Sequence, residues 1–156
     1  MSDDTNTEAR TLTIVRVFDA PAGLLFKAHA EREHIMQWFG PVGWPVTFCE
    51  MDFRVGGQWR MAMTGSTGVQ NPPFGGTYLE IEPDKLIKWD NGFEIAGAER
   101  MVTTITFDEL HGRTTLTSRT VFGSARMYAE HVGAGFEQGT NSGLDQLERH
   151  VAKMAS

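Results

Sequence analysis

The chain has 156 residues, a length that fits one domain and can bury a core without a disulfide or a metal to hold it together. Fourteen basic and twenty acidic side chains give a formal net charge of -6. Proteins that bind nucleic acids usually carry a basic stripe, and none is found here. The acidic balance also argues against binding to an anionic membrane surface.

The cysteine content and the termini favour a cytoplasmic protein that is not inserted in a membrane. Cys49 is the only cysteine, so no disulfide can form within the chain. No apolar run approaches the ~18 residues needed to cross a bilayer. Residues 1–10 are polar and lack the features of a signal peptide. We expect a disordered lead over residues 1–10 and a single domain over residues 11–156.

One strand and two short helices are expected first. Residues 11–18 are β-branched and typical of a strand. Asp19 is a candidate helix N-cap, and Pro21 suits a first helical turn. The spacing of a short amphipathic helix follows at Leu24, Leu25, Ala28 and His29. A second helix is expected over residues 31–39, where a Gly-Pro pair ends it.

Strands and turns make up the middle of the chain. Six further strands are expected over residues 44–53, 58–64, 74–82, 85–91, 100–110 and 113–121. Tight turns are expected at Gly56-Gly57, Pro83-Asp84 and His111-Gly112. The pattern predicts a meander-like antiparallel sheet of about six or seven strands with one buried face.

Alternation predicts which side chains face the interior. The inward apolar residues are Cys49, Met51, Phe53, Trp59, Met61, Met63, Ile87, Trp89, Met101, Ile105 and Phe107. Thr103 interrupts this row, and residues 114–120 are mostly hydroxyl-bearing. The buried face therefore cannot be wholly apolar.

The end of the chain is predicted to be helical. Ser124 can cap a short helix to His131, Gly133 breaks it, and a long helix runs from Ala134 to about Met154. The inward stripe of the long helix is Phe136, Thr140, Leu144, Leu147, Val151 and Met154. One helix against one curved sheet is an α+β plan that often leaves a cavity.

Five groups of residues occur in an order that is specific to one family. They are Trp38-Phe39-Gly40-Pro41; Glu50, Asp52, Arg54, Gly56, Gly57 and Trp59; Gly76, Tyr78, Leu79, Glu80, Ile81 and Pro83; Phe107, Glu109, Gly112, Thr114, Leu116 and Thr117; and Gly135, Phe136, Gly139, Leu144 and Leu147. Over residues 12–154 the chain resembles the activator of heat-shock-protein-90 ATPase homologue-like branch of the SRPBCC, or START-like (Bet v 1-like), superfamily.

The resemblance implies a helix-grip fold with a cavity between the sheet and the C-terminal helix. Similar members are mostly bacterial, and the superfamily includes lipid and sterol carriers, hormone receptors, polyketide cyclases and a chaperone co-activator domain. Fold alone does not select among these functions. The family commonly places a tryptophan after the residue matching Gly139, whereas this chain has Thr140. The smaller hydroxyl side chain should widen or polarise the cavity there.

The candidate ligand-binding cavity is formed by inward aromatic and methionine side chains together with one threonine. These residues are Trp38, Trp59, Met61, Met63, Trp89, Met101, Phe136 and Thr140. Methionine suits adaptable apolar pockets, although each residue taken singly is typical of ordinary core. Glycines 135, 139 and 143 share one helix face, which leaves room for a ligand or for a close backbone, such as a homodimer partner.

No spacing typical of a metal site, a cofactor site or a catalytic triad is present. His29 and His34 are five residues apart, and we interpret them as solvated histidines at helix ends. Cys49 is interpreted as a small inert hydrophobe. Arg54 is expected in a surface ion pair that fixes the hairpin.

Three functions are compatible with these features. The first is the binding of a small apolar, aromatic or lipid-like ligand. The second is a cyclase, dehydratase or hydrolase that uses the same cavity; its catalytic residues are not defined by a motif, and the candidates are Glu99, Arg100, His131 and Tyr78. The third is a chaperone co-activator-like interaction surface around Trp44 and residues 64–74.

Overall fold

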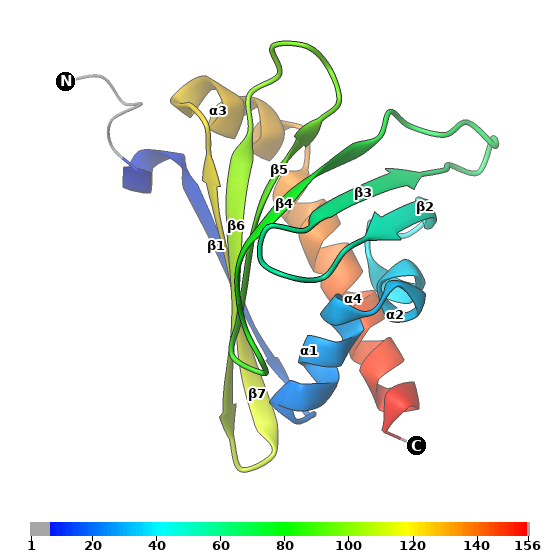
Figure 1. The fold of residues 1–156 in the computed structure, drawn as a ribbon, viewed down its shortest axis with the longest axis vertical. Helices are drawn as coiled ribbons and strands as arrows, with labels where there is room; N and C mark the ends of the chain where they lie inside the picture. The colour runs from blue at the N-terminus through cyan, green and yellow to red at the C-terminus, as the bar shows by residue number, and fades with distance from the viewer. Residues whose placement is uncertain (1–6, 156) are drawn as a thin grey trace.

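The protein folds as a curved antiparallel sheet with a long helix lying against its inner face (Figure 1). The computed structural model describes residues 7–155. The seven strands are ordered β1-β7-β6-β5-β4-β3-β2. The elements are the 3-10 helix η2 (Thr7–Arg10), β1 (Thr11–Phe18), α1 (Ala22–Ala30), α2 (Arg32–Trp38), β2 (Val46–Met51), β3 (Gln58–Met63), β4 (Phe74–Glu82), β5 (Leu86–Phe93), β6 (Met101–Leu110), β7 (Arg113–Phe122), α3 (Ala125–Gly133) and α4 (Phe136–Met154). The predicted α+β helix-grip architecture is confirmed.

The expected disordered lead covers two different parts of the chain. Residues 1–6 lie outside the described residues. Residues 7–10 form η2, and the Thr11 hydroxyl donates a hydrogen bond to the Thr7 carbonyl at 2.6 Å.

All three predicted turns are confirmed by positive backbone φ angles, including Pro83-Asp84 between β4 and β5, where Asp84 has a φ of 61°. His111 and Gly112, between β6 and β7, have φ values of 54° and 77°, and Gly56, between β2 and β3, has a φ of 85°. This region is open to glycine without steric cost, whereas a non-glycine residue such as His111 enters it less readily. Irregular pairing in β2 and in β4 accompanies the bend of the sheet.

The starts of the helices differ in part from expectation. Asp19 does not cap α1, because Pro21 occupies the N-cap position. The Ala22 amide instead donates to Oε1 of Glu109, on β6, at 2.7 Å, so a distant carboxylate takes the place of a local cap. Ser124 caps α3 as predicted, accepting from the Met127 amide at 3.1 Å. Helix α4 begins at Phe136 because Gly135, with a φ of 97°, is left-handed.

Strands β5, β6 and β7 align their inward residues in transverse rows, which we call rungs. Rung one is Asn91, Met101 and Phe122; rung two is Trp89, Thr103 and Thr120; rung three is Ile87, Ile105 and Ser118; rung four is Phe107 and Leu116. Rungs one to three each contain at least one polar side chain, whereas both residues of rung four are apolar.

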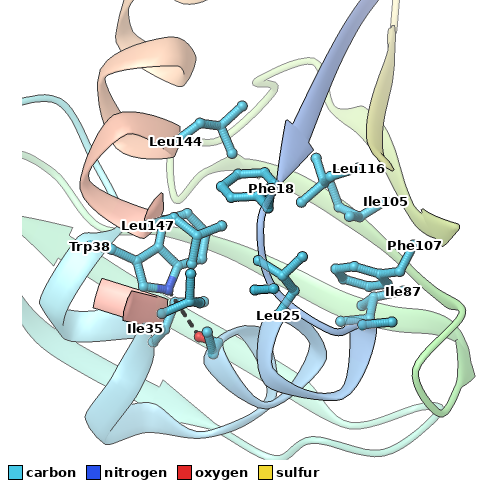
Figure 2. Close-up of a cluster of buried hydrophobic side chains, with 14 of the residues drawn as sticks. Phe18, Leu25, Ile35, Trp38, Ile87, Ile105, Phe107, Leu116, Leu144 and Leu147 are labelled. Atoms are coloured by element: carbon cyan, nitrogen blue, oxygen red, sulfur yellow. Dashed lines mark hydrogen bonds between the residues drawn. The ribbon is translucent and has the colours of Figure 1, made fainter. Parts of the chain in front are cut away.

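The solid part of the core lies around rung four. Phe18, Leu25, Leu116 and Leu147 are almost fully buried and come from β1, α1, β7 and α4. Figure 2 shows them gathered with Phe107, and also shows the hydrogen bond from the Trp38 indole to the Ala28 carbonyl, which measures 3.0 Å. Each buried side chain of this size contributes about 1.5–3 kcal/mol. This cluster fixes α1, α2 and α4 at one end of the sheet.

Candidate functional site

A cavity of about 630 Å³ lies between rungs one to three of the sheet and helices α3 and α4. Its apolar wall is formed by large side chains from seven elements and from the residue that follows α2; they include Trp38, Phe39, Met63, Phe74, Trp89, Met101, Met127, Phe136 and Leu144. Protein cavities that bind small molecules typically measure about 300–1,000 Å³ and are mainly apolar with a few polar groups. The size and lining fall within that description.

Six of the eight residues predicted for a ligand cavity lie together on this wall. They are Trp38, Met63, Trp89, Met101, Phe136 and Thr140. The other two, Trp59 and Met61, are buried but do not line the cavity. The Trp59 ring packs edge-on against Phe74 and Trp89, with ring centroids 5.9 and 6.2 Å away. Alternation predicted that Trp59 and Met61 face inward. Both are buried, but they pack within the core and do not reach the cavity.

Hydroxyl groups make one side of the cavity polar. Thr103 and Thr120, in rung two, share a hydrogen bond of 2.8 Å between their side-chain oxygens. The Thr140 hydroxyl donates to the Phe136 carbonyl at 2.9 Å. Ser118, in rung three, also lines the cavity. In the Thr103–Thr120 pair one hydroxyl donates and the other accepts, so each of the two oxygens has a partner without a ligand.

Asn91 contributes a buried side-chain oxygen to the wall. Its Oδ1 is buried and has no hydrogen-bond partner among the described residues. The sequence analysis did not include Asn91 among the cavity residues, although the alternation of side chains along the strand places it on the inward face. Asn91 is two residues from Trp89 and four from Ile87, both predicted to face inward. A buried acceptor left unpaired costs free energy, so a ligand donor or a water here would stabilise the protein.

His29 corrects the interpretation of the histidines as solvated groups. Only 4% of its surface is exposed, and its ring lies edge-on to Trp38 at 4.7 Å and to Phe107 at 5.4 Å. Nδ1 is 2.8 Å from the Leu25 carbonyl oxygen. Burial lowers the pKa of His29 to about 4. The amphipathic spacing already indicated this burial, because it places His29 on the same helix face as Leu25 and Ala28.

His34, which is half-buried, also has a histidine partner, at the junction of α2 and α4. Its Nδ1 is 2.9 Å from Nε2 of His150. Burial, His34 and Lys153 lower the pKa of His150. Over residues 7–155, no group of three or more His, Cys, Asp or Glu side chains is placed to hold a metal ion.

The cavity reaches solvent beside α3. The exposed residues Glu99, Arg126 and Glu130 lie on this part of the wall. Glu99 accepts a hydrogen bond from Ser124 at 2.9 Å and lies 3.5 Å from the Arg126 guanidinium, which is 3.6 Å from Glu130. All three charges of the wall are therefore at the solvent-facing end, which we call the mouth.

The four candidate acid or base residues are separated by the fold. Glu99 and His131 line the cavity near the mouth. Arg100 is on the outer face, where it donates to Asp90 at 2.8 Å and to the Gly75 carbonyl at 2.6 Å. Tyr78 is buried away from the cavity beside Phe53, and burial raises its pKa. The four do not form one constellation.

The glycines of α4 face the cavity and the segment that follows α2. A Cβ on Gly143 would lie 3.5 Å from the Gly40 carbonyl oxygen, and one on Gly139 would lie 3.8 Å from Pro41. Glycines 135, 139 and 143 all line the cavity. The backbone that approaches Gly143 belongs to this same chain.

Cys49 and Arg54 occupy the environments expected for structural residues. Cys49 is buried, and burial raises the pKa of its thiol to about 11, which disfavours a reactive thiolate. Arg54 Nε lies 2.9 Å from Asp52 Oδ2 on the surface of the hairpin. No helix of the described part of the chain is long and apolar enough to span a bilayer.

A curved antiparallel sheet, a C-terminal helix in its hollow and a cavity between them define an SRPBCC-type helix-grip domain, which is a generic ligand-binding fold. A family model described as "Activator of Hsp90 ATPase homolog 1-like protein" matches residues 19–152, and the chain belongs to this family. No curated protein matches the chain.

Solved structures of bacterial proteins share the fold over most of the chain. A solution structure from Arthrobacter aurescens is 25% identical, with a TM-score of 0.86, over 94% of this chain and 88% of that one. A crystal structure from Nitrosomonas europaea is 22% identical, with a TM-score of 0.84, over 94% and 97%. A crystal structure from Chromobacterium violaceum is 28% identical, with a TM-score of 0.75, over 91% and 96%.

Proposed function

We propose that this protein binds a small, largely apolar molecule in the cavity between the sheet and α4. The observation that carries the proposal is the cavity of about 630 Å³ beside a core that is otherwise well packed. Apolar surface that a ligand covers is removed from water, which stabilises the complex by about 25 cal/mol per Å². The methionines on the wall can adapt their shape to an apolar guest.

Binding is favoured over catalysis because the polar groups of the wall are mostly engaged with one another. Thr103 pairs with Thr120, Thr140 with the helix backbone, and Glu99 with Ser124 and Arg126. A catalytic acid or base needs to reach the reacting atom. Groups held in these pairs are better suited to giving the cavity its shape and polarity than to acid–base catalysis.

The test is a thermal-shift screen with lipids, polyketides and flavonoids, followed by calorimetry on the compounds that stabilise the protein. The matched variant is Thr140→Trp, which places a ring in the cavity at a position where relatives commonly have one. It should fold, and it should lose the ligand-induced shift. The control is Gln138→Trp, an exposed position on the same helix, which should retain the shift.

Two results would count against the proposal. One is that no compound raises the melting temperature of the wild-type protein. The other is that Thr140→Trp binds the stabilising compounds as tightly as the wild type does. A cytoplasmic location and a homodimer remain predictions, to be tested by fractionation and by sedimentation.

A further inference from the structure

His29 places a hydrogen-bonding group at the end of the cavity opposite the mouth. Its ring lines the cavity between Trp38 and Phe107, and Phe107 belongs to rung four. The Leu25 carbonyl can only accept a hydrogen bond, so Nδ1 of His29 carries the hydrogen. Because burial keeps the pKa near 4, the ring is neutral at pH 7, and Nε2 presents a lone pair.

Nε2 has no hydrogen-bond partner among residues 7–155. Nδ1 is therefore satisfied by the fold, whereas Nε2 has no partner among these residues and is not among their fully buried side-chain atoms, so a ligand in the cavity can reach it. An apolar ligand that covered this acceptor without supplying a donor would lose free energy. A ligand that supplies a donor at this point would avoid that cost.

Charge restricts which ligand group can lie beside His29. The charged residues of the wall are Glu99, Arg126 and Glu130, all at the mouth. A carboxylate or a phosphate at the deep end would be buried without a cation, which is strongly unfavourable. The polar end of a ligand that reaches His29 must therefore be uncharged and must donate a hydrogen.

Resting on the proposed function, we propose that Nε2 of His29 accepts a hydrogen bond from an uncharged hydroxyl group at the leading end of a long, apolar ligand. The rungs give the ligand its shape. Rung one and rung four are six residues apart along β6, or roughly 20 Å of strand. A ligand that extends from the mouth to His29 is thus elongated, with an apolar body lying across rungs two and three.

The test compares 1-decanol with decyl methyl ether, which keeps the oxygen but has no hydrogen to donate. Calorimetry on the wild-type protein should show that the alcohol binds about five- to tenfold more tightly, as expected for one net hydrogen bond. His29→Phe keeps a ring of similar size but has no acceptor. In that variant the preference for the alcohol should disappear.

The matched control is His131→Phe. His131 is a second histidine on the wall, its Nδ1 is 3.0 Å from the Met127 carbonyl, and it also contacts aromatic rings. Because it lies near the mouth, this variant should alter the affinity for both compounds alike and keep their ratio. A preference lost equally in both variants would show that the effect is not specific to His29.

The outcomes separate this inference from the proposed function. Equal affinity of the wild type for both compounds, or a preference that survives in His29→Phe, overturns the role of His29 while the cavity still binds. If neither compound binds, the proposed function fails for this ligand class and the inference fails with it. If His29→Phe does not fold, nitrogen NMR of the wild type decides. The Nε2 resonance of His29 should move with the alcohol and not with the ether, and an unmoved resonance overturns the inference.

Discussion

The same three strands form a solid core at one end and a hollow at the other. In rung four, Phe107 and Leu116 pack with Leu25, Phe18 and Leu147, and none of these five residues lines the cavity. In rungs two and three, the corresponding β7 residues are Thr120 and Ser118, and both line the cavity. The pairing of β5, β6 and β7 is continuous through both ends, so the change from solid core to cavity follows the change in side chains.

Helix α4 shows the same change along its length. Its second half contributes the buried Leu147 and Val151, whereas its first half presents Gly139, Thr140 and Gly143 to the cavity, between Phe136 and Leu144. The small residues of the first half and the small polar residues of β7 border the same space. Packing stability is thus concentrated at one end of the molecule, and the capacity to admit a guest at the other.

The largest effect is expected from a truncation in the solid end. Leu147→Ala should lower the free energy of unfolding by about 3 kcal/mol, because it creates a new void among fully buried neighbours. Met63→Ala, on the cavity wall, should cost roughly 1 kcal/mol, since it enlarges a space that already exists. Urea unfolding measures both. Equal losses would mean that the cavity wall is packed as tightly as the core.

A slightly smaller effect is expected from acid, through His29. Its folded pKa of about 4 is below the unfolded value of 6.5, so between these pH values the unfolded chain binds more protons. The contribution is fully present above pH 6.5 and is lost as the pH falls toward 4, by about 2–3 kcal/mol at pH 4.5. Urea unfolding at pH 7 and pH 4.5 should show a smaller loss in His29→Phe than in the wild type. Parallel losses would contradict the assignment.

The sequence predicted the architecture because most of its signals are local. The turn at His111-Gly112, the break before Phe136 and the inward stripe of α4 each follow from a few neighbouring residues. Alternation identified the inward face of each strand, including Trp59 and Met61. It did not tell which inward residues border a void, because that depends on packing across strands.

The polar groups of the site were harder to predict for the same reason. The hydroxyl-bearing character of β7 was expected, yet the pairing of Thr103 with Thr120 depends on the register between two strands. His29 looked like a solvated residue because histidine is usually partly exposed, whereas here two aromatic rings enclose it. Asp19 is not the cap because Pro21 occupies the N-cap position, and the carboxylate that reaches this helix end belongs to Glu109, on β6.

Asn91 offers a way to improve stability at the expense of binding. Asn91→Leu removes the unpaired buried acceptor of rung one, so it should raise the free energy of unfolding by about 1 kcal/mol. It should also weaken binding of ligands that carry a second polar group near the mouth. Thermal unfolding with and without ligand measures both effects. A loss of stability in the free protein would show that Asn91 is satisfied in solution, as by a bound water.

The smallest effects, of opposite sign, are expected from two glycines of the hollow end. Gly139→Ala should stabilise the protein by about 1 kcal/mol, because alanine favours a helix and its Cβ would lie 3.8 Å from Pro41, an ordinary contact. Gly135→Ala should destabilise it by about 1 kcal/mol, because residue 135 has a φ of 97°. If the first glycine serves to leave room for a guest, the more stable Gly139→Ala variant should bind more weakly. An unchanged affinity would leave the helix glycines without a role in the cavity.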